Sequence, residues 1–266
     1  MPVVASILFG LVCAFLLSYA SFEPLQVTPF SESTLGFAGS FENALYFVVL
    51  AAVGATLLYL LLKRNRHRLI TVIIGIALTA AVLMLAIIYL SAALSAVSLP
   101  YGDVLILALS IFVTVVADYV VLKGRRFSSI VILGIGGALG TFLGFSLPTA
   151  STILILTVLA VYDAYAVYRG PVGKIAQNGI DQLRGLSYSS RDVQIGLGDL
   201  TFYSMLSGHM LLTFGLVPCL SSIAGILVGC LASLRMAEKK GVFPGLPLPI
   251  FLGLGTGFLA LFLSSL

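Results

Sequence analysis

Two aspartates, Asp163 and Asp199, are the residues of this sequence best suited to do chemistry. Each lies in a long apolar segment, near the end at which that segment meets the same basic loop. An ionised carboxylate inside a lipid bilayer is costly, so an aspartate within a membrane span indicates a functional site. At helical rise, Asp163 lies about 9 Å from Arg169 and Asp199 about 12 Å from Arg191, so the two aspartates have similar depths and could face each other.

Two opposed carboxyl groups can do what one cannot. Close together they do not both ionise easily, so one keeps its proton while the other acts as a base. The base can deprotonate a water molecule and direct it at a peptide carbonyl, while the protonated partner donates a hydrogen bond to the carbonyl oxygen. This chemistry needs no cofactor, no metal and no covalent enzyme intermediate.

Histidine and cysteine give little support to other chemistries. His67 belongs to a basic loop and His209 stands alone in an apolar segment, so the two do not have the spacing of metal ligands. The three cysteines are an odd number without paired spacing, and we interpret them as packing residues. They are Cys13, Cys219 and Cys230.

The other acidic residues fall mostly outside the apolar segments. We place three of them in an external loop, three in cytoplasmic loops and one at an outer helix end: Glu23, Glu32 and Glu42; Asp181, Asp192 and Glu238; and Asp103. Asp118 is the exception, because it lies within a span, near its cytoplasmic end. We expect it to be neutralised by Lys123, Arg125 or Arg126, or to reach interfacial water.

The composition identifies the elements that must position the aspartates. The chain has 266 residues, of which 60% are hydrophobic and 9% charged, and it repeats apolar runs of roughly 18 to 22 residues, long enough to cross a bilayer. The sequence therefore predicts an all-α, polytopic membrane protein. The nine predicted spans are 3–20, 44–62, 69–90, 101–122, 128–146, 149–168, 193–214, 216–235 and 246–264.

Basic residues predict the topology. Every Lys and Arg follows the second, fourth, sixth or eighth span, and under the positive-inside rule these four loops are cytoplasmic. The N-terminus is then cytoplasmic and the C-terminus external. No Lys or Arg precedes residues 3–20, which argues against a cleaved signal peptide. The basic residues form no face with interleaved aromatic residues, so nucleic acid is not an expected partner.

We expect one integral membrane domain with three parts. Residues 1–168 hold the first six spans, 169–192 form a cytoplasmic loop, and 193–266 hold the last three spans. Glycines within the spans, at 134, 136, 137, 140 and 144 and at 253, 255 and 257, are interpreted as contacts between closely packed helices. The spacing of the first group resembles that of a dinucleotide-binding loop. We do not interpret it as one, because these glycines lie in the middle of a span.

Three short motifs now carry a resemblance to a known family. They are Tyr162-Asp163, Gly196-Leu197-Gly198-Asp199 and Pro244-Gly245-Leu246-Pro247. In this order and on these spans they resemble the YD, GxGD and PAL motifs of the presenilin and signal peptide peptidase family of intramembrane aspartyl proteases. The predicted orientation resembles presenilin rather than the inverted signal peptide peptidase, and a chain this compact is most similar to a prokaryotic, archaeal homologue.

The resemblance implies an activity and its residues. Asp163 and Asp199 would be the catalytic pair of an endopeptidase that cuts the transmembrane helix of a single-pass protein in the cell membrane. Tyr162, Gly196, Leu197 and Gly198 would support the site. The segment from Pro244 through Gly245 and Leu246 to Pro247 would bind substrate. Gly245 stands where the family usually has Ala, and the short loop 169–192 makes self-cleavage there doubtful.

Physical roles for these neighbours fit the resemblance, although other interpretations stay open. The glycines beside Asp199 remove side-chain bulk, but they could also serve helix packing. Tyr162 could position the pair or belong to an aromatic belt at the membrane surface. The proline-rich segment cannot form regular helical hydrogen bonds and could pair with an extended substrate, but it could also simply begin the last helix.

A different class of function also remains open. A transporter or channel could use Asp118, Asp163 and Asp199 to relay protons or bind cations, with a broken helix start near the site. No inverted repeat is evident in the sequence, which counts modestly against transport.

Overall fold

The computed structural model of the chain describes residues 2–20, 27–30, 36–64, 66–95, 101–123, 125–168, 187–190, 193–240 and 243–265. Within these ranges the chain forms helices joined by short connections, together with one small hairpin. The helices are α1 (Pro2–Tyr19), α3 (Phe37–Lys63), α4 (His67–Leu94), α5 (Gly102–Lys123), α6 (Arg125–Ser146), α7 (Thr149–Tyr168), α9 (Leu197–Phe214), α10 (Leu216–Lys240) and α11 (Pro247–Ser264). The strands are β1 (Ser187–Ser190) and β2 (Val193–Gly196).

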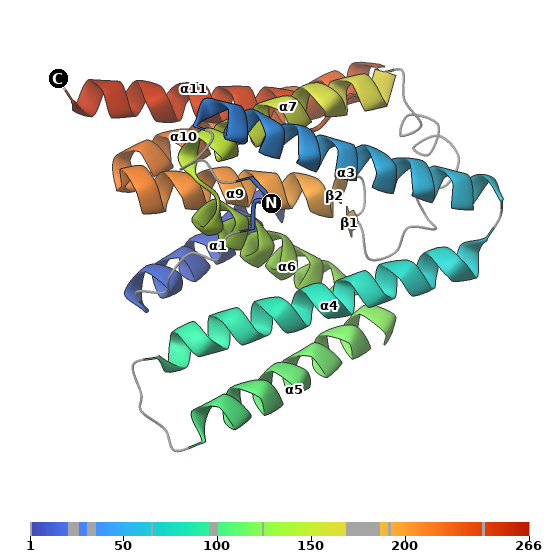
Figure 1. Ribbon diagram of the computed structural model, residues 1–266. Helices are drawn as coiled ribbons and strands as arrows, with labels where there is room; N and C mark the ends of the chain where they lie inside the picture. The colour runs from blue at the N-terminus through green and yellow to red at the C-terminus, as the bar shows by residue number, and fades with distance from the viewer. Residues whose placement is uncertain are drawn as a thin grey trace.

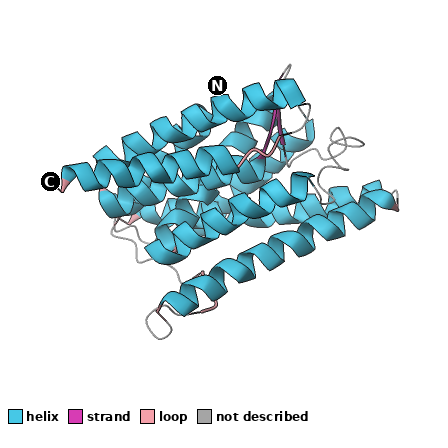
Figure 2. Cartoon of the chain, turned by 90° about the horizontal axis from the view of Figure 1, so that it is seen from above, coloured by secondary structure: helices cyan, strands magenta, loops and turns pink. Residues whose placement is uncertain are grey.

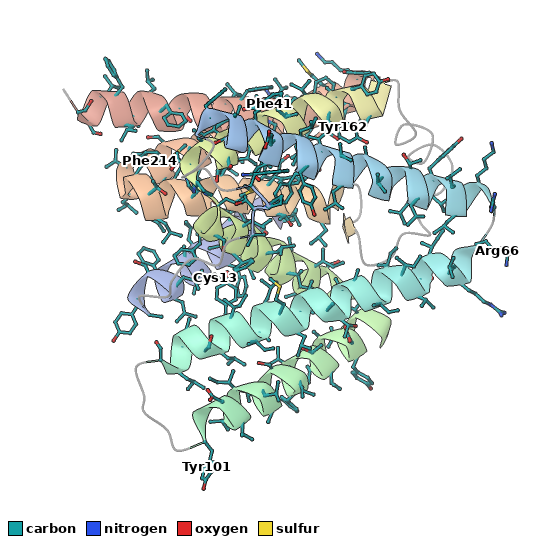
Figure 3. The ribbon with its side chains drawn as sticks, in the orientation of Figure 1. Cys13, Phe41, Arg66, Tyr101, Tyr162 and Phe214 are labelled. Carbon is teal, nitrogen blue, oxygen red and sulfur yellow. The ribbon has the colours of Figure 1, made fainter. Side chains whose placement is uncertain are left out.

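The helices run roughly along one common direction, as Figure 2 shows. Among the described residues, eight helices are long and apolar enough to cross a membrane: α1, α3, α4, α5, α6, α7, α10 and α11. The predicted all-α, multi-pass membrane protein is therefore confirmed. In Figure 3, Arg66, between α3 and α4, and Tyr101, at the start of α5, lie at opposite ends of these helices. Which end is cytoplasmic stays a prediction.

Helix α9 is the predicted span that is not among these eight. It carries Asp199, His209 and several hydroxyl side chains, which lower its hydropathy. It also lies in the middle of the molecule (Figure 1), where it contacts α1, α6, α7, α10 and α11. A helix surrounded by other helices does not need an apolar face toward lipid, so its polar residues can be accommodated inside the protein.

Several predicted boundaries were wrong. Helix α3 begins at Phe37 rather than at 44, so Glu42 lies in the helix and not in a loop. Helix α10 continues to Lys240, so Glu238 also belongs to a helix. Both helices have polar ends beyond their apolar cores, and hydropathy detects only the core.

The end of the predicted cytoplasmic loop and the first four residues of the predicted seventh span form a hairpin. Strands β1 and β2 pair antiparallel, with Ser187 opposite Gly196, so α9 begins at Leu197 rather than at 193. Residues 169–186, which make up most of the predicted loop, lie outside the described residues. Because β2 leads into α9 without a gap, the hairpin places the first turn of α9, and Asp199 within it, directly after a strand.

Glycines of α6 bring this helix close to α9. A Cβ on Gly144 would lie 2.5 Å from the carbonyl oxygen of Met205, and one on Gly140 would lie 2.8 Å from the Met205 nitrogen. The packing interpretation is thus confirmed for the glycines at 136, 137, 140 and 144, but not for Gly134, whose nearest neighbour would be Phe9 at 3.8 Å. It also holds for Gly253, where a Cβ would lie 2.7 Å from Ile226 Cγ1, but it was wrong for Gly255, which has nothing within 4 Å.

Candidate active site

Asp163 lies in the second half of α7 and reaches the start of α11. Its Oδ2 accepts a hydrogen bond from the backbone N–H of Leu246, at 3.1 Å, and it also interacts with the backbone N–H of Gly245. Leu246 is the N-cap of α11, and Pro247 follows at the first helical position. Proline suits this position because its missing N–H would have no partner within the helix. The start of α11 thus offers backbone donors to a carboxylate.

Asp199 is the third residue of α9. Its carboxyl group reaches back to the backbone N–H of Gly196, the N-cap of the same helix. A carboxylate that returns to the N-cap in this way helps to define where a helix begins. The sequence therefore holds Asp199 at the N-terminal end of α9, on the side of the molecule where α7 ends and α11 begins.

The two carboxyl groups converge on one short backbone segment. They are close enough to interact electrostatically with each other. Asp163 accepts from Leu246 N–H, while Asp199 lies against the preceding residue, since a Cβ on Gly245 would be 2.7 Å from Asp199 Oδ2. The structure thus brings together two aspartates from α7 and α9 and the segment before α11, which lie far apart in the sequence.

Gly245 is tighter than the sequence suggested. In the third motif, Gly245 stands where the resembling family usually has Ala, an exchange between two small residues. In the structure, the space that an alanine methyl group would occupy is taken by the Asp199 carboxyl group. Contacts below 3 Å between such atoms are essentially unknown, so an alanine here would require Asp199 to move.

Tyr203 is a site residue that sequence reasoning missed. Its hydroxyl group donates a hydrogen bond to the backbone carbonyl of Gly245 at 2.8 Å, and its side chain is 3% exposed. It also lies near enough to both aspartates and to Cys230 of α10 to interact with them. One signal was present in the sequence, because Tyr203 follows Asp199 by four residues and therefore shares its helix face.

The glycines beside Asp199 do not serve close packing. A Cβ on Gly196 would lie 3.8 Å from Asp199 Oδ2, and one on Gly198 would lie 3.9 Å from Phe202. These are ordinary contact distances, so both positions leave room near the carboxyl group. Leu197, between them, packs against the cluster formed by α1, α4 and α6.

The remaining predicted residues are placed as follows. Tyr162 is half-buried on α7 (Figure 3), and as the neighbour of Asp163 it points about 100° away around the helix. Its role in positioning the pair stays a prediction. Pro244 is buried in the non-helical segment before α11, so this proline-rich segment does interrupt helical structure next to the aspartates.

Asp118 is separate from this group. Its Oδ2 accepts a hydrogen bond from the hydroxyl group of Thr79 at 2.7 Å, which ties α5 to α4. The predicted partners Lys123, Arg125 and Arg126 have side chains outside the described residues. Asp118 therefore lies in the pair of helices at the edge of the molecule (Figure 1), away from α9.

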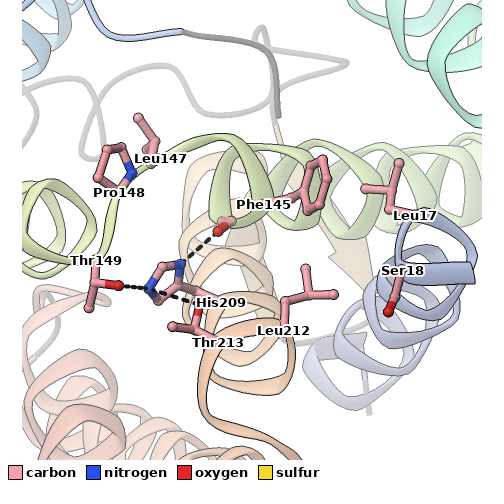
Figure 4. A pocket seen from close by; sticks show the side chains of 10 residues that line it. Leu17, Ser18, Phe145, Leu147, Pro148, Thr149, His209, Leu212 and Thr213 are labelled. Atoms are coloured by element: carbon pink, nitrogen blue, oxygen red, sulfur yellow. Dashed lines mark hydrogen bonds between the residues drawn. The ribbon is translucent and has the colours of Figure 1, made fainter. Parts of the chain in front are cut away.

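A cavity of about 380 Å³ lies toward the opposite end of α9 and includes His209 in its lining. In Figure 4 the imidazole lies between α6 and the start of α7. Its Nδ1 is 2.7 Å from the carbonyl oxygen of Gly144, so Nδ1 donates, and the hydroxyl group of Thr149 lies 3.2 Å from Nε2. His209 follows Asp199 by ten residues, about 15 Å along the helix, so this cavity is not part of the aspartate site.

Comparison with known proteins identifies a relative by sequence and a shared fold by structure. No protein family model matches the chain. Presenilin-B of Dictyostelium discoideum is 33% identical over 137 residues, which is 45% of this chain but only 28% of that protein. The similarity to this curated relative thus spans less than a third of its length.

Solved structures match almost the whole chain. One structure of a presenilin family intramembrane aspartate protease, in space group C222, superposes with a TM-score of 0.68 at 21% identity and covers 99% of this chain and 100% of that one. A second, in space group P2, gives a TM-score of 0.64 at 24% identity over 98% and 94% of the two chains. The chain therefore has the fold of the presenilin family intramembrane aspartate proteases.

Proposed function

We propose that this protein is an intramembrane aspartyl endopeptidase and that Asp163 and Asp199 are its catalytic pair. The observation that carries this proposal is the convergence of both carboxyl groups on Gly245 and Leu246. The likeness in fold and the partial likeness to Presenilin-B support it. Two interacting carboxyl groups that share one proton are the arrangement that aspartic proteases use.

In the proposed reaction, the ionised carboxylate takes a proton from water and the resulting hydroxide adds to the peptide carbonyl carbon. The protonated carboxyl group gives its proton to the carbonyl oxygen, which forms a tetrahedral diol. The diol then collapses: the C–N bond breaks, the leaving nitrogen takes a proton from the carboxyl group that first accepted one, and a diol hydroxyl group returns its proton to the carboxylate that had protonated the carbonyl oxygen. The pair thus returns to its starting charge after each turnover.

The proposed substrate is a transmembrane helix of a single-pass membrane protein. Hydrolysis requires its backbone to be locally extended, because a helix shields its peptide bonds. The non-helical residues from Pro244 to Leu246 lie beside the aspartates, and Gly196 and Gly198 leave room near Asp199. This segment is the proposed place where an extended substrate meets the pair.

The proposed setting is the cell membrane, with the N-terminus and the aspartate end of the bundle on the cytoplasmic side. This orientation rests on the basic residues that follow the second, fourth, sixth and eighth spans.

The test is cleavage of a single-span substrate by the purified protein in liposomes. Wild-type protein should release two fragments, and both Asp163→Asn and Asp199→Asn should abolish release while keeping the side-chain size. Asp118→Asn is the matched control, because it removes a carboxylate that is also within the spans but bonds to Thr79. It should retain cleavage.

Transport is the outcome that would replace this proposal. If the liposomes show proton or cation flux that depends on Asp163 and Asp199, and no substrate is ever cleaved, the carboxyl groups serve ion binding and the protease proposal is wrong.

A further inference from the structure

The peptide group between Gly245 and Leu246 is held from both of its polar ends. Its carbonyl oxygen accepts a hydrogen bond from the Tyr203 hydroxyl group of α9, at 2.8 Å. Its N–H donates to Asp163 Oδ2 of α7, at 3.1 Å. A single planar amide thus bridges the helix that carries Asp199 and the helix that carries Asp163.

We infer that Tyr203 is a positioning residue for the proposed catalytic pair, acting on both aspartates through the Gly245–Leu246 peptide group. The inference rests on the proposed function, which supplies the reaction that the positioning serves. Fixing this peptide group sets the direction of the N–H that Asp163 accepts. It also sets where the Gly245 Cα lies, and a Cβ built on that atom would be 2.7 Å from Asp199 Oδ2, so the carboxyl group lies against this residue.

The hydrogen bonds of this group run in one direction. The Tyr203 proton is donated to the carbonyl of Gly245. Donation thus passes from Tyr203 to the carbonyl of Gly245, and from the N–H of Leu246 to Asp163. Each bond polarises the next, and amide resonance makes the N–H a better donor when the carbonyl is bonded.

Tyr203 acts through the peptide group rather than on a substrate. Its side chain is 3% exposed, and its one proton is committed to Gly245. It is therefore not available as an acid toward a bound peptide. Removing its hydroxyl group should disturb Asp163 and Asp199 without removing either one.

The chain contains a matched control for this bond. Tyr89 of α4 donates a hydrogen bond to the carbonyl of Ala138 in α6, also at 2.8 Å, and likewise has a cysteine partner, Cys13. The same three groups, thiol, phenol and backbone carbonyl, thus occur at a second place without an aspartate. Tyr89→Phe removes the same type of hydrogen bond as Tyr203→Phe.

The experiment measures cleavage of the single-span substrate, thermal unfolding and the pH dependence of kcat for both variants. Tyr203→Phe should lower kcat roughly five- to tenfold, the effect of losing one hydrogen bond worth about 1 kcal/mol, with KM nearly unchanged. The acidic limb of its profile should move to higher pH, because a weaker N–H donor stabilises the ionised Asp163 less. Tyr89→Phe should leave kcat and the profile as in wild type.

One further variant keeps the test decisive if Tyr203→Phe folds poorly. Replacing Tyr203 with 3-fluorotyrosine keeps the ring and strengthens the donor, so the acidic limb should move to lower pH. A purely structural role for Tyr203 would not produce shifts of opposite sign.

The inference is overturned if Tyr203→Phe keeps wild-type kcat and profile, or if its losses equal those of Tyr89→Phe. In both cases the proposed function stands as long as the wild-type protein cleaves the substrate and this cleavage depends on Asp163 and Asp199. If wild-type protein does not cleave at all, the proposed function fails and the positioning role fails with it.

Discussion

Two places in this molecule put a carboxyl group within the spans, and they differ in what surrounds it. Asp118 joins α5 to α4 through one hydroxyl group, that of Thr79. Asp163 meets a second carboxyl group, the backbone of a broken helix start and a tyrosine that binds the same peptide group. The first arrangement gives one carboxyl group a single hydroxyl donor, whereas the second brings two carboxyl groups together, as the proposed reaction requires.

Under the proposed function, this difference means that depth in a membrane span does not by itself identify a catalytic carboxyl group. All three aspartates lie in apolar segments, and the cost of burial applies to each. What separates them is access to backbone N–H donors at helix starts. Helices α9 and α11 begin beside each other and each offers such donors to one carboxyl group.

The largest effect is expected when either member of the pair is replaced. Asp163→Asn and Asp199→Asn should each lower cleavage by roughly a thousandfold or more, and the double variant should be no worse than either single variant, because the two groups act as one unit. Residual rates of the three variants in liposomes would measure this.

If the fold-losses in cleavage rate of the two single variants multiply in the double variant, Asp163 and Asp199 do not act as one unit. Asp118→Asn combined with either single variant serves as the control, since it should change the rate by no further amount.

The next largest effect concerns the space at Gly245. Gly245→Val should lower cleavage by more than about tenfold, because its Cβ would lie 2.7 Å from Asp199 Oδ2 and its methyl groups would need still more room. Gly255→Val is the control, since Gly255 has nothing within 4 Å and is exposed. Cleavage rates of the two variants at equal folded protein would compare them, and equal rates would refute the role of this contact.

The motifs predicted much of this site. Tyr162-Asp163, the Gly196–Asp199 motif and the prolines before the last helix were expected to lie near one another, and the structure places Asp163, Asp199, Gly245 and Leu246 together. Hydropathy also predicted the spans, because long apolar segments are needed to cross a bilayer. Both signals are local in the sequence.

What the sequence could not predict depends on contacts between distant segments. Tyr203 binds a backbone carbonyl 42 positions away, and a carbonyl carries no sequence signal. The packing role expected for Gly255 was wrong because a glycine within a span does not show which face it occupies. The start of α9 was misplaced because the segment 193–196 is as apolar as a helix start but pairs with β1.

A smaller effect is expected where α6 meets α9. Gly140→Ala should destabilise the protein by roughly 1 to 3 kcal/mol, because a methyl group there would meet the backbone of Thr201 and Met205. Gly75→Ala in α4, with nothing within 4 Å, should not destabilise it. Thermal unfolding in detergent would measure both, and a Gly140→Ala protein as stable as wild type would show that the two helices can separate at little cost.

The smallest effect is expected at the edge of the molecule. Thr79→Val should remove the hydrogen bond to Asp118 at a cost of about 1 kcal/mol, without changing cleavage. The same unfolding and cleavage assays would test this, and a loss of cleavage at unchanged stability would mean that the α4–α5 pair takes part in the reaction.

The pH dependence of kcat tests most directly whether Asp163 and Asp199 share one proton. At low pH both carboxyl groups are protonated and no base remains; at high pH both are ionised and no acid remains. Cleavage should therefore rise and fall between about pH 4 and about pH 8 with a single maximum. A rate that stays constant across that range would contradict the account.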